Sequence, residues 1–561
     1  MNTPLKCTTC GAPCNSTHVF LRDDLPFLPT LLRNNEPPTG SMIGPLRSSA
    51  LRVSATIDEI QAEILRTSDF LKALQDKRRH LQLIEEDYKA VLSPVRRVPS
   101  EVLAEIFYAC SGNEKSEWGY NVFHVKAGPW VLSRVCRLWR QVSRSLCPSS
   151  WATFSVPVLQ KLRKDPISLL KAALSHCGNR RLKFIFHGPR WDSRDVDMEV
   201  RRTSKSLFQI LLSLSHRWKS VDLDITQELF QLLPSVRGKV SCLETCIIST
   251  GPITESFNAL EFAPNLKCLT FKGLRDCLLP VPVSTSNLVK FSDDRATDYF
   301  GHLHQMYLDI VRGSPSLEEF EVRHQGQAEG DLPVATPRII HPTLYTLAIR
   351  EGSFMRSLEL PELESVDIQK NSPEVGDRST FPDVLPALHD LIIRSRCSLT
   401  YLSIADTVLD DNIISILSLS PQLAYLGFSF TQWSEDSDFI LQTVIEKMAE
   451  TTINSSGDNE LSLIPLLEEF SVYMFDRRSR FREVVEVGFV DGNFVNMLKV
   501  RLDYASPLQF VTVNGSTRFL RFTGVDSDDV EQLVKWRDEN RFEELAIQSG
   551  FGPTCTLHRV V

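Results

Sequence analysis

The sequence lacks the features by which several classes of protein are identified. None of its apolar runs approaches the roughly 20 residues that a membrane-spanning helix needs. Its net charge of −8 gives no electrostatic reason to bind nucleic acid, because affinity for phosphate depends on many Lys and Arg side chains acting together. We therefore expect neither a membrane protein nor a protein that binds nucleic acid.

The common motifs of catalysis are also missing. We find no P-loop, no G-x-G-x-x-G after a predicted strand, no H-E-x-x-H and no G-x-S-x-G. The histidines are dispersed, and pairs such as His302 with His304, or Asp410 with Asp411, lie in segments that already have a structural interpretation. We predict that the chain is not an enzyme and uses no cofactor.

The 13 cysteines do not form the dense framework of a small secreted domain, because they are scattered over 561 residues. The first residues, MNTPLKCTTCGAPC, contain one Lys and no following apolar core, so they do not resemble a secretory signal. These features predict reduced thiols and a cytoplasmic or nuclear location.

Residues 1–48 are rich in Pro, Asn, Ser and Thr, which predicts a flexible N-terminal arm that packs little. Within it, Cys7, Cys10, Cys14 and His18 have donor atoms suited to a tetrahedral zinc site. Their spacing is tighter than in common zinc modules and no second half follows, so we predict free thiols and no metal. Zinc binding remains the alternative.

Residues 49–91 predict a coiled-coil helix, because the segment lacks Gly and Pro and repeats apolar residues with a 3-4 spacing. Thr67, Arg78 and Glu85 fall on the same seam and weaken it. Two interpretations remain: a homodimer through this helix, or a helix that packs back on its own chain. The apolar residues are Ile57, Ile60, Ile64, Leu71, Leu74 and Leu81.

Two further amphipathic helices are predicted within residues 92–156. In VPSEVLAEIF a helix begins near Pro99, and Leu103, Ile106 and Phe107 line one of its faces. A second helix over PWVLSRVCRLWRQVSRSLC has a wide apolar stripe opposite four arginines. Helix-turn-helix proteins also expose basic side chains, but their helices are joined by three or four residues, whereas about twenty intervene here. We expect the arginines to form a solvated face.

The strings SPVRRVPSEVLAEIF, GPWVLSRVCRLWR and SSWATF resemble the F-box, the helical module that binds the adaptor subunit of SCF-type cullin–RING ubiquitin ligases. Together with LLRNNEPP and the heptad helix, they resemble the large F-box-like family of mushroom-forming fungi. Val98 stands where the family has leucine, and the linker between the helices is longer. The resemblance implies that the F-box core or adaptor contact is made by Pro94, Pro99, Leu103, Ile106, Phe107, Val131, Leu132, Val135, Cys136 and Trp139.

Residues 157–561 repeat the pattern apolar-x-x-apolar-x-apolar, mostly at intervals of about 19 to 29 residues. Helical spacing between the copies indicates strand, turn and helix in alternation. The segment resembles leucine-rich-repeat proteins, which predicts an α/β fold with an irregular solenoid; an ordinary parallel α/β domain is the alternative. The copies are LETCII, LKCLTF, LEEFEV, LYTLAI, LESVDI, LHDLII, LTYLSI, LAYLGF, LEEFSV and FEELAI, beginning at Leu243, Leu266, Leu317, Leu344, Leu363, Leu388, Leu399, Leu423, Leu467 and Phe542.

The positions between the apolar residues of these strands are expected to face solvent on the concave side. Many of them are acidic, including Glu364, Asp367, Asp390, Glu543 and Glu544, and tyrosines join them. This pattern predicts an acidic face with aromatic anchors for a basic protein segment, or charges that only keep the strands soluble. The candidate substrate-binding residues are Glu318, Glu319, Glu321, Tyr345, Tyr401, Tyr425, Glu468 and Glu469.

The resemblance to F-box and leucine-rich-repeat proteins implies a substrate-recognition subunit of an SCF-type ubiquitin ligase. Its F-box would bind the adaptor, and its repeats would bind a protein substrate. The alternative is a non-enzymatic repeat scaffold that oligomerises through its coiled coil without a ligase.

Overall fold

The computed structural model describes most of the chain and divides it into two compact units, Met1–Pro99 and Ser100–Val561. The described residues are 25–34, 36–112, 119–158, 165–189, 197–251, 257–275, 285–296, 301–324, 332–368, 383–431, 433–453, 459–474, 485–504, 506–515 and 520–548.

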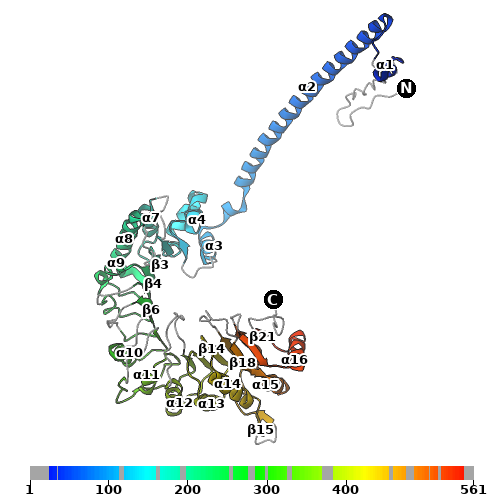
Figure 1. Ribbon diagram of the computed structural model, residues 1–561. Helices are drawn as coiled ribbons and strands as arrows, with labels where there is room; N and C mark the ends of the chain where they lie inside the picture. Colours follow the sequence, from blue (N-terminus) through cyan, green and yellow to red (C-terminus); the bar gives the residue numbers. More distant parts are fainter. Residues whose placement is uncertain are drawn as a thin grey trace. The chain divides into compact units, whose positions relative to one another are not determined.

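The first unit is dominated by one long helix, α2 (Gly40–Leu92), which Figure 1 draws without a break. It is preceded by α1 (Leu28–Asn34) and followed by the short 3-10 helix η2 (Pro94–Arg97). The helix begins at Gly40, so the predicted boundary at residue 49 is too late; the helix continues through Gly44 and Pro45, although proline inside a helix removes one backbone hydrogen bond. No residue of α1 or α2 is buried.

The second unit is built around one sheet, which among the described residues has fifteen parallel strands that follow one another in chain order. The predicted α/β class is therefore confirmed. Its strands are β1 (Tyr120–Asn121), β2 (Thr153–Pro157), β3 (Leu182–His187), β4 (Trp218–Ile225), β5 (Thr245–Thr250), β6 (Cys268–Arg275), β7 (Lys290–Ala296), β8 (Glu319–His324), β10 (Thr346–Ala348), β12 (Ser365–Ile368), β13 (Tyr401–Ala405), β14 (Tyr425–Phe430), β17 (Glu469–Met474), β19 (Phe510–Gly515) and β21 (Glu544–Gln548).

Three small two-stranded sheets accompany the large one in the described part of the chain. Strand β9 (Ile339–Ile340) pairs with β11 (Leu358–Glu359), and β18 (Val485–Asp491) pairs with β20 (Leu520–Gly524), both in parallel. Strand β15 (Thr451–Ile453) pairs with β16 (Asn459–Leu461) in antiparallel orientation.

Helices connect most strands of the large sheet, and Figure 1 shows α8, α10, α12 and α13 along one side of it. The core lies between strands and helices, where Phe184, Phe291 and Leu402 are fully buried. None of the described helices is both long and apolar enough to cross a membrane. The helices are α3 (Ser100–Gly112), α4 (Pro129–Val135), α5 (Arg137–Ser145), α6 (Pro148–Trp151), α7 (Pro166–His176), α8 (Met198–Ser213), η3 (Ser215–Arg217), α9 (Gln227–Phe230), η4 (Leu233–Val236), α10 (Gly301–Gly313), α11 (Gly352–Arg356), α12 (Val384–Ser395), α13 (Asn412–Ser418), α14 (Glu435–Met448), α15 (Gly492–Asp503) and α16 (Ser527–Asp538).

Nine of the ten sequence repeats coincide with strands of the large sheet, and one does not. LHDLII, at residues 388–393, lies in α12, so its assignment to a strand is wrong. Within it Ile392 is 1% exposed and Ile393 is 52% exposed, whereas a strand on that register would have buried Ile393. Apolar residues three apart fit a helix as well as this repeat, which is why the pattern misled.

The predicted boundary at residues 156 and 157 falls inside β2, a strand of the large sheet. The long linker between the two F-box-like helices contributes β1, which pairs with β2 through Tyr120 and Phe154. The helices α3–α6 are therefore continuous with the sheet and do not form a separate compact unit.

Candidate interaction surfaces

The predicted F-box-like residues separate into a buried set and an exposed set. Leu103 is 1% exposed and Phe107 is fully buried, so both serve the core of the second unit. In contrast, Ile106, Val131 and Val135 remain 44%, 41% and 56% exposed. Leu132 and Trp139 are partly buried, whereas Pro94, Pro99 and Cys136 are exposed.

Three further apolar side chains extend the exposed set: Val102, which was not predicted to take part, and Leu138 and Leu146, which belong to the predicted apolar stripe of the second helix. Val102 is 49% exposed and lies one turn before Ile106 on α3. Leu138 on α5 is 37% exposed, and Leu146 directly after α5 is 44% exposed. The exposed apolar residues of α3, α4 and α5, with Leu146, are hereafter the apolar helical surface: Val102, Ile106, Val131, Val135, Leu138 and Leu146.

The single helix predicted over residues 129–147 is wrong, because the chain breaks at Cys136 into α4 and α5. Cys136 has extended backbone angles, φ −155° and ψ 178°, and its Sγ accepts a hydrogen bond from the backbone N–H of Trp139 at 3.4 Å. This cap lets α5 turn so that the Trp139 ring packs on Phe107, with ring centroids 4.9 Å apart.

The four arginines of this segment are exposed, as the sequence predicted, and two of them also donate hydrogen bonds to backbone carbonyl groups. Arg134 donates from Nη1 to the carbonyl oxygen of Val125 at 2.9 Å, which ties α4 to the preceding loop. Arg140 donates from Nε to the carbonyl oxygen of Ser133 at 2.9 Å, which ties α5 back to α4. The two bonds hold the helices on either side of the Cys136 break.

Two buried tryptophans join these helices to the first strands of the sheet. Trp130 and Trp151 meet edge to face at 4.9 Å between ring centroids. Their indole N–H groups donate to the carbonyl oxygens of Val122 and Ser143, at 3.2 and 2.9 Å. Because each buried N–H has a partner, the tryptophans hold α4 and α6 firmly, and the apolar helical surface is presented on a rigid support.

A second candidate surface is the face of the large sheet that carries its less buried side chains. In most strands every second residue is partly exposed, and the parallel register aligns these residues in rows. We call this the polar face. Its charges are distributed unevenly, since β13, β14, β17, β19 and β21 contain no Lys or Arg, whereas β3 to β8 include several.

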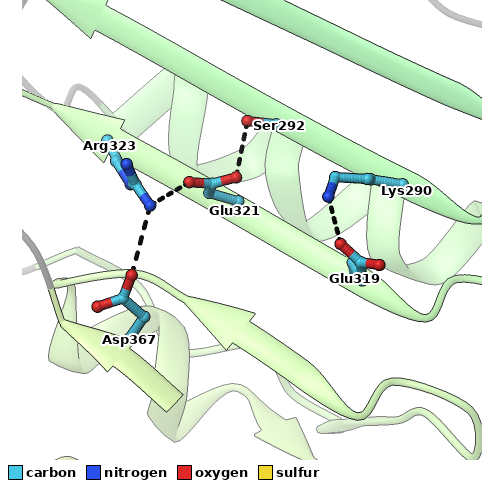
Figure 2. Close-up of polar contacts among 6 residues, drawn as sticks. All are labelled: Lys290, Ser292, Glu319, Glu321, Arg323 and Asp367. Atoms are coloured by element: carbon cyan, nitrogen blue, oxygen red, sulfur yellow. Dashed lines mark hydrogen bonds and ion pairs between the residues drawn. The ribbon is translucent and has the colours of Figure 1, made fainter. Parts of the chain in front are cut away.

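Ion pairs link the acidic residues at the centre of the polar face (Figure 2). Arg323 on β8 bridges Glu321 on its own strand and Asp367 on β12, the latter at 3.3 Å. Glu321 also accepts a hydrogen bond from Ser292 on β7 at 3.0 Å, and Lys290 pairs with Glu319. The hydrogen bond to Glu319 raises the pKa of Lys290, so its positive charge persists beside the carboxylates.

A row of three side chains lies farther along the polar face, on strands that contain no Lys or Arg. Tyr401, Tyr425 and Glu469 face one another across β13, β14 and β17, and we call them the tyrosine row. The two phenol rings stack at 4.3 Å with an interplanar angle of 7°. Burial, reinforced by the neighbouring Tyr401 and Glu469, raises the pKa of Tyr425, so its hydroxyl keeps its proton.

The tyrosine row lies over small residues of the next row. Ser403 and Ser471 are 8% and 0% exposed, and Ser471 donates from Oγ to Glu469 at 3.0 Å. A Cβ atom at Gly427 would come within 2.6 Å of the Tyr425 hydroxyl oxygen. Glycine at this position therefore allows the Tyr425 ring to lie flat along its strand.

The predicted substrate-binding residues are brought to the polar face with two corrections. Glu319, Glu321, Tyr401, Tyr425 and Glu469 lie on strands, whereas Asp390 lies on α12 because its repeat is helical. The sequence also predicted an acidic face without partners for its charges, but Lys290, Arg323 and Ser292 contact the carboxylates of the central strands. The remaining residues directly precede strands: Glu318, Tyr345, Glu364, Glu468 and Glu543.

Cys7, Cys10, Cys14 and His18 lie outside the described residues, so the choice between zinc and free thiols is not addressed by the structure. Within the part of the chain that the structure describes, no three His, Cys, Asp or Glu side chains are arranged to hold a metal ion. Burial raises the pKa of the Cys147 thiol to about 11 and that of Cys177 to about 12, which makes both thiols unreactive.

A scan against protein-family models matches no family, and a search of the curated proteins finds no match. The F-box-like and leucine-rich-repeat-like assignments therefore stay predictions that depend on the motifs themselves.

Proposed function

We propose that the chain is the substrate-recognition subunit of an SCF-type cullin–RING ubiquitin ligase. In this proposal α3 to α5 bind the adaptor, and the polar face binds a protein to be ubiquitinated. Transfer chemistry would belong to partner subunits, and this chain would supply proximity, which turns an encounter into a reaction within one complex.

The observation that carries the proposal is the apolar helical surface. Ile106 and Val135 are roughly half exposed, yet Leu103 and Phe107 on the same module are buried. Six exposed apolar side chains on three successive helices are an unfavourable arrangement in water unless a partner covers them. At about 25 cal/mol per Å² of buried apolar surface, a few such side chains would supply several kcal/mol of docking free energy.

The test is co-purification of the adaptor subunit with variants of the exposed set. Substituting Asp for Ile106 or Val135 should abolish recovery of the adaptor, because a carboxylate would be buried in the interface. Leu103→Asp is unsuitable, since Leu103 is buried and its replacement would unfold the module. The matched control is Ile393→Asp, since Ile393 is 52% exposed on α12 and lies outside the module.

Full-length wild-type protein that recovers no adaptor would contradict the proposal. So would an equal loss of the adaptor in Ile393→Asp and Ile106→Asp, because the effect would then be general.

We also propose that the sheet and its helices form an irregular leucine-rich-repeat solenoid. Nine motif copies coincide with parallel strands in chain order, which supports a stack of strand, turn and helix units. In such a stack the polar face is the recognition surface, and substrate specificity would reside in its side chains.

For the substrate we propose a basic segment that binds at the tyrosine row. The five strands around it contain no Lys or Arg, so a cationic side chain would meet the aromatic pair and Glu469 without repulsion from those strands. The ion-paired centre at Arg323 is less suited, because its carboxylates already have partners.

A fluorescein-labelled tetra-arginine peptide provides a probe for this site, with fluorescence anisotropy as the measurement. Tyr401→Ala together with Tyr425→Ala should weaken binding roughly tenfold, because the cation would lose its aromatic contact. The control is Tyr504→Ala, since Tyr504 is 40% exposed and lies just beyond α15. Equal binding by all three proteins would contradict a cationic ligand at the tyrosine row.

A scaffold that acts without a ligase is the second candidate function. The observation that favours it is α2, a helix of 53 residues of which none is buried. Recovery of self-oligomers without any adaptor in the co-purification would support the scaffold.

A further inference from the structure

Helix α2 has an apolar seam that the rest of the described chain leaves uncovered. The helix is 53 residues long and none of its residues is buried. Helices in proteins are stabilised mainly by packing of an apolar face, and intrinsic propensity contributes less. Within α2, Ile57, Ile60 and Leu71 are 59%, 54% and 55% exposed. A helix with this composition requires a partner.

The spacing of the seam indicates the kind of partner. Apolar residues recur every 3.5 residues on average, which keeps one face against another helix only if the two supercoil around each other. The seam continues beyond the predicted segment in both directions, to Ile43 and to Leu92. Its positions are Ile43, Leu46, Ala50, Val53, Ile57, Ile60, Ile64, Thr67, Leu71, Leu74, Arg78, Leu81, Glu85, Tyr88 and Leu92.

We propose that α2 pairs with α2 of a second copy of this chain in an antiparallel two-stranded coiled coil. A partner must provide a seam of matching length, and the next longest of the described helices, α8, has only 16 residues. Among the described helices, only α2 of a second copy has a seam as long as that of α2. A coiled coil of two helices can accommodate Arg78 and Glu85, because their long charged side chains can reach water past one partner helix. A bundle of three or more helices would enclose these side chains.

Charge on the seam sets the orientation. In a parallel pair in register, Arg78 would lie against its own copy, and Lys77 at the flanking position would bring two more cations to the same layer. Like charges held this close destabilise a pair. In an antiparallel pair each Arg78 lies beside a different part of the partner helix, so the four cations are separated.

The pairing would give the assembly two recognition units. Leu92, the last residue of α2, is followed after a short segment by Ser100, where the second unit begins. In an antiparallel pair the C-terminal ends of the two helices point in opposite directions, so the second units are attached at opposite ends. A substrate with two basic segments could then engage both copies and gain avidity. This last consequence depends on the proposed function, whereas the dimer does not.

Sedimentation velocity of the full chain tests the pairing. We expect a dimer whose dissociation constant rises at least about 100-fold in Leu71→Asp, because two carboxylates would enter the seam. Leu65→Asp is the matched control, because Leu65 is 58% exposed on the same helix but lies off the seam. Leu74→Asp is a second substitution on the seam and should also dissociate the dimer. If both variants dissociate it, the effect is not specific to residue 71.

A wild-type protein that stays monomeric at 100 times the concentration used for the variants would overturn the pairing. So would a trimer or larger assembly, or equal dissociation by Leu65→Asp and Leu71→Asp. Adaptor recovery is measured on the same proteins. A variant that loses the dimer but still recovers the adaptor shows that the two properties are independent. A wild-type protein that forms the dimer but recovers no adaptor would contradict the ligase role and leave the pairing intact.

The orientation is tested by mixing wild-type chain with Arg78→Glu carrying a different tag. A parallel pair would favour mixed dimers strongly, since Arg78 would face Glu at the same position. An antiparallel pair should give mixed dimers at the statistical proportion, because residue 78 does not meet its own copy. Strong preference for mixed dimers would overturn the antiparallel arrangement.

Discussion

Helices α2 and α12 have the same kind of apolar spacing, and the chain covers only one of them. Helix α12 buries seven of its twelve residues, including Leu388, Leu391 and Ile392. Helix α2 buries none of 53. The two differ in what surrounds them: α12 contacts α11 and α13 and lies beside the large sheet, whereas α2 belongs to a unit with no sheet among its described residues.

This difference shows what an amphipathic pattern can and cannot predict. Periodic apolar residues predict that a face will be covered, because exposed apolar surface is unfavourable in water. They do not predict whether the cover comes from the same chain or another one. The predictions below compare α2 with α12 and with other parts of the second unit. They run from the largest expected change in the free energy of unfolding to the smallest.

The largest difference is expected between Leu391→Ala on α12 and Leu65→Ala on α2. Leu391 is fully buried, so its truncation leaves a cavity and should lower the free energy of unfolding by roughly 4 kcal/mol. Leu65 is 58% exposed and lies off the seam, so its truncation should change that free energy by less than about 0.5 kcal/mol. Urea unfolding followed by tryptophan fluorescence measures the first effect, and thermal loss of helical circular dichroism measures the second.

The next effect concerns a buried carboxyl directly before α11. Glu351 is 6% exposed, and burial raises its pKa to about 7 from an ordinary value of 4.5. The folded protein then holds a proton that the unfolded chain has lost between these pH values. The free energy of unfolding should therefore fall as pH rises through this window, by up to about 3 kcal/mol from this group.

Glu351→Gln removes the carboxyl group, and with it the loss of stability that its ionisation in a buried site causes. Relative to wild type, the variant should be up to about 3 kcal/mol more stable at pH 8 and show little gain near pH 4.5. Urea unfolding at the two pH values measures the difference. A gain that is the same at both would contradict the assignment of the pKa.

A smaller difference in stability is expected between Ala substitutions at two glycines, Gly427 on the sheet and Gly44 on α2. Gly427→Ala should displace the Tyr425 ring and cost about 1 to 2 kcal/mol, because an added Cβ would lie 2.6 Å from its hydroxyl oxygen. Gly44→Ala should instead change the stability of α2 by less than about 0.5 kcal/mol, because the better helix propensity of Ala is offset by the crowding of its Cβ against the following Pro45, and no atom beyond the chain neighbours and the helix's own backbone lies within 4 Å. Thermal unfolding measures both, and near-ultraviolet circular dichroism should change for Gly427→Ala alone.

The smallest effect is expected on the exposed side of α2. Asp76 pairs with Arg79 at 3.1 Å, and the two side chains are 58% and 74% exposed. Asp76→Asn should lower the stability of the helix by only about 0.3 kcal/mol, and less at high salt, because exposed ion pairs are screened by water. A loss above 1 kcal/mol would mean that this side of α2 is covered, and the seam would not be its only contact surface.

Much of the fold could be predicted from short patterns. LEEFEV and LAYLGF become β8 and β14, because alternating apolar residues on a parallel strand are buried against helices. Strands β2, β3 and β4 were not predicted, since their sequences do not contain the repeat and only pairing with neighbouring strands selects them. The break at Cys136 also escaped prediction, because V-C-R continues the helical spacing on both sides.

The residues of the candidate surfaces could be predicted from the sequence. Which of them are buried and which are exposed could not. Leu103 and Ile106 are both apolar residues of α3, yet one is buried and the other is 44% exposed. The difference depends on where α5 packs, which no local pattern specifies. Likewise Glu321 and Glu469 are both acids on the polar face, but among the described residues only Glu321 forms an ion pair with an arginine.

The sequence by itself determined that this protein combines a long heptad helix with a chain of strand and helix repeats. Both depend on local periodicity, and periodicity is a property of neighbouring residues. Only the tertiary structure decided which apolar residues the protein covers for itself. Burial depends on residues that are distant in the chain, and in α2 the chain provides none among the described residues.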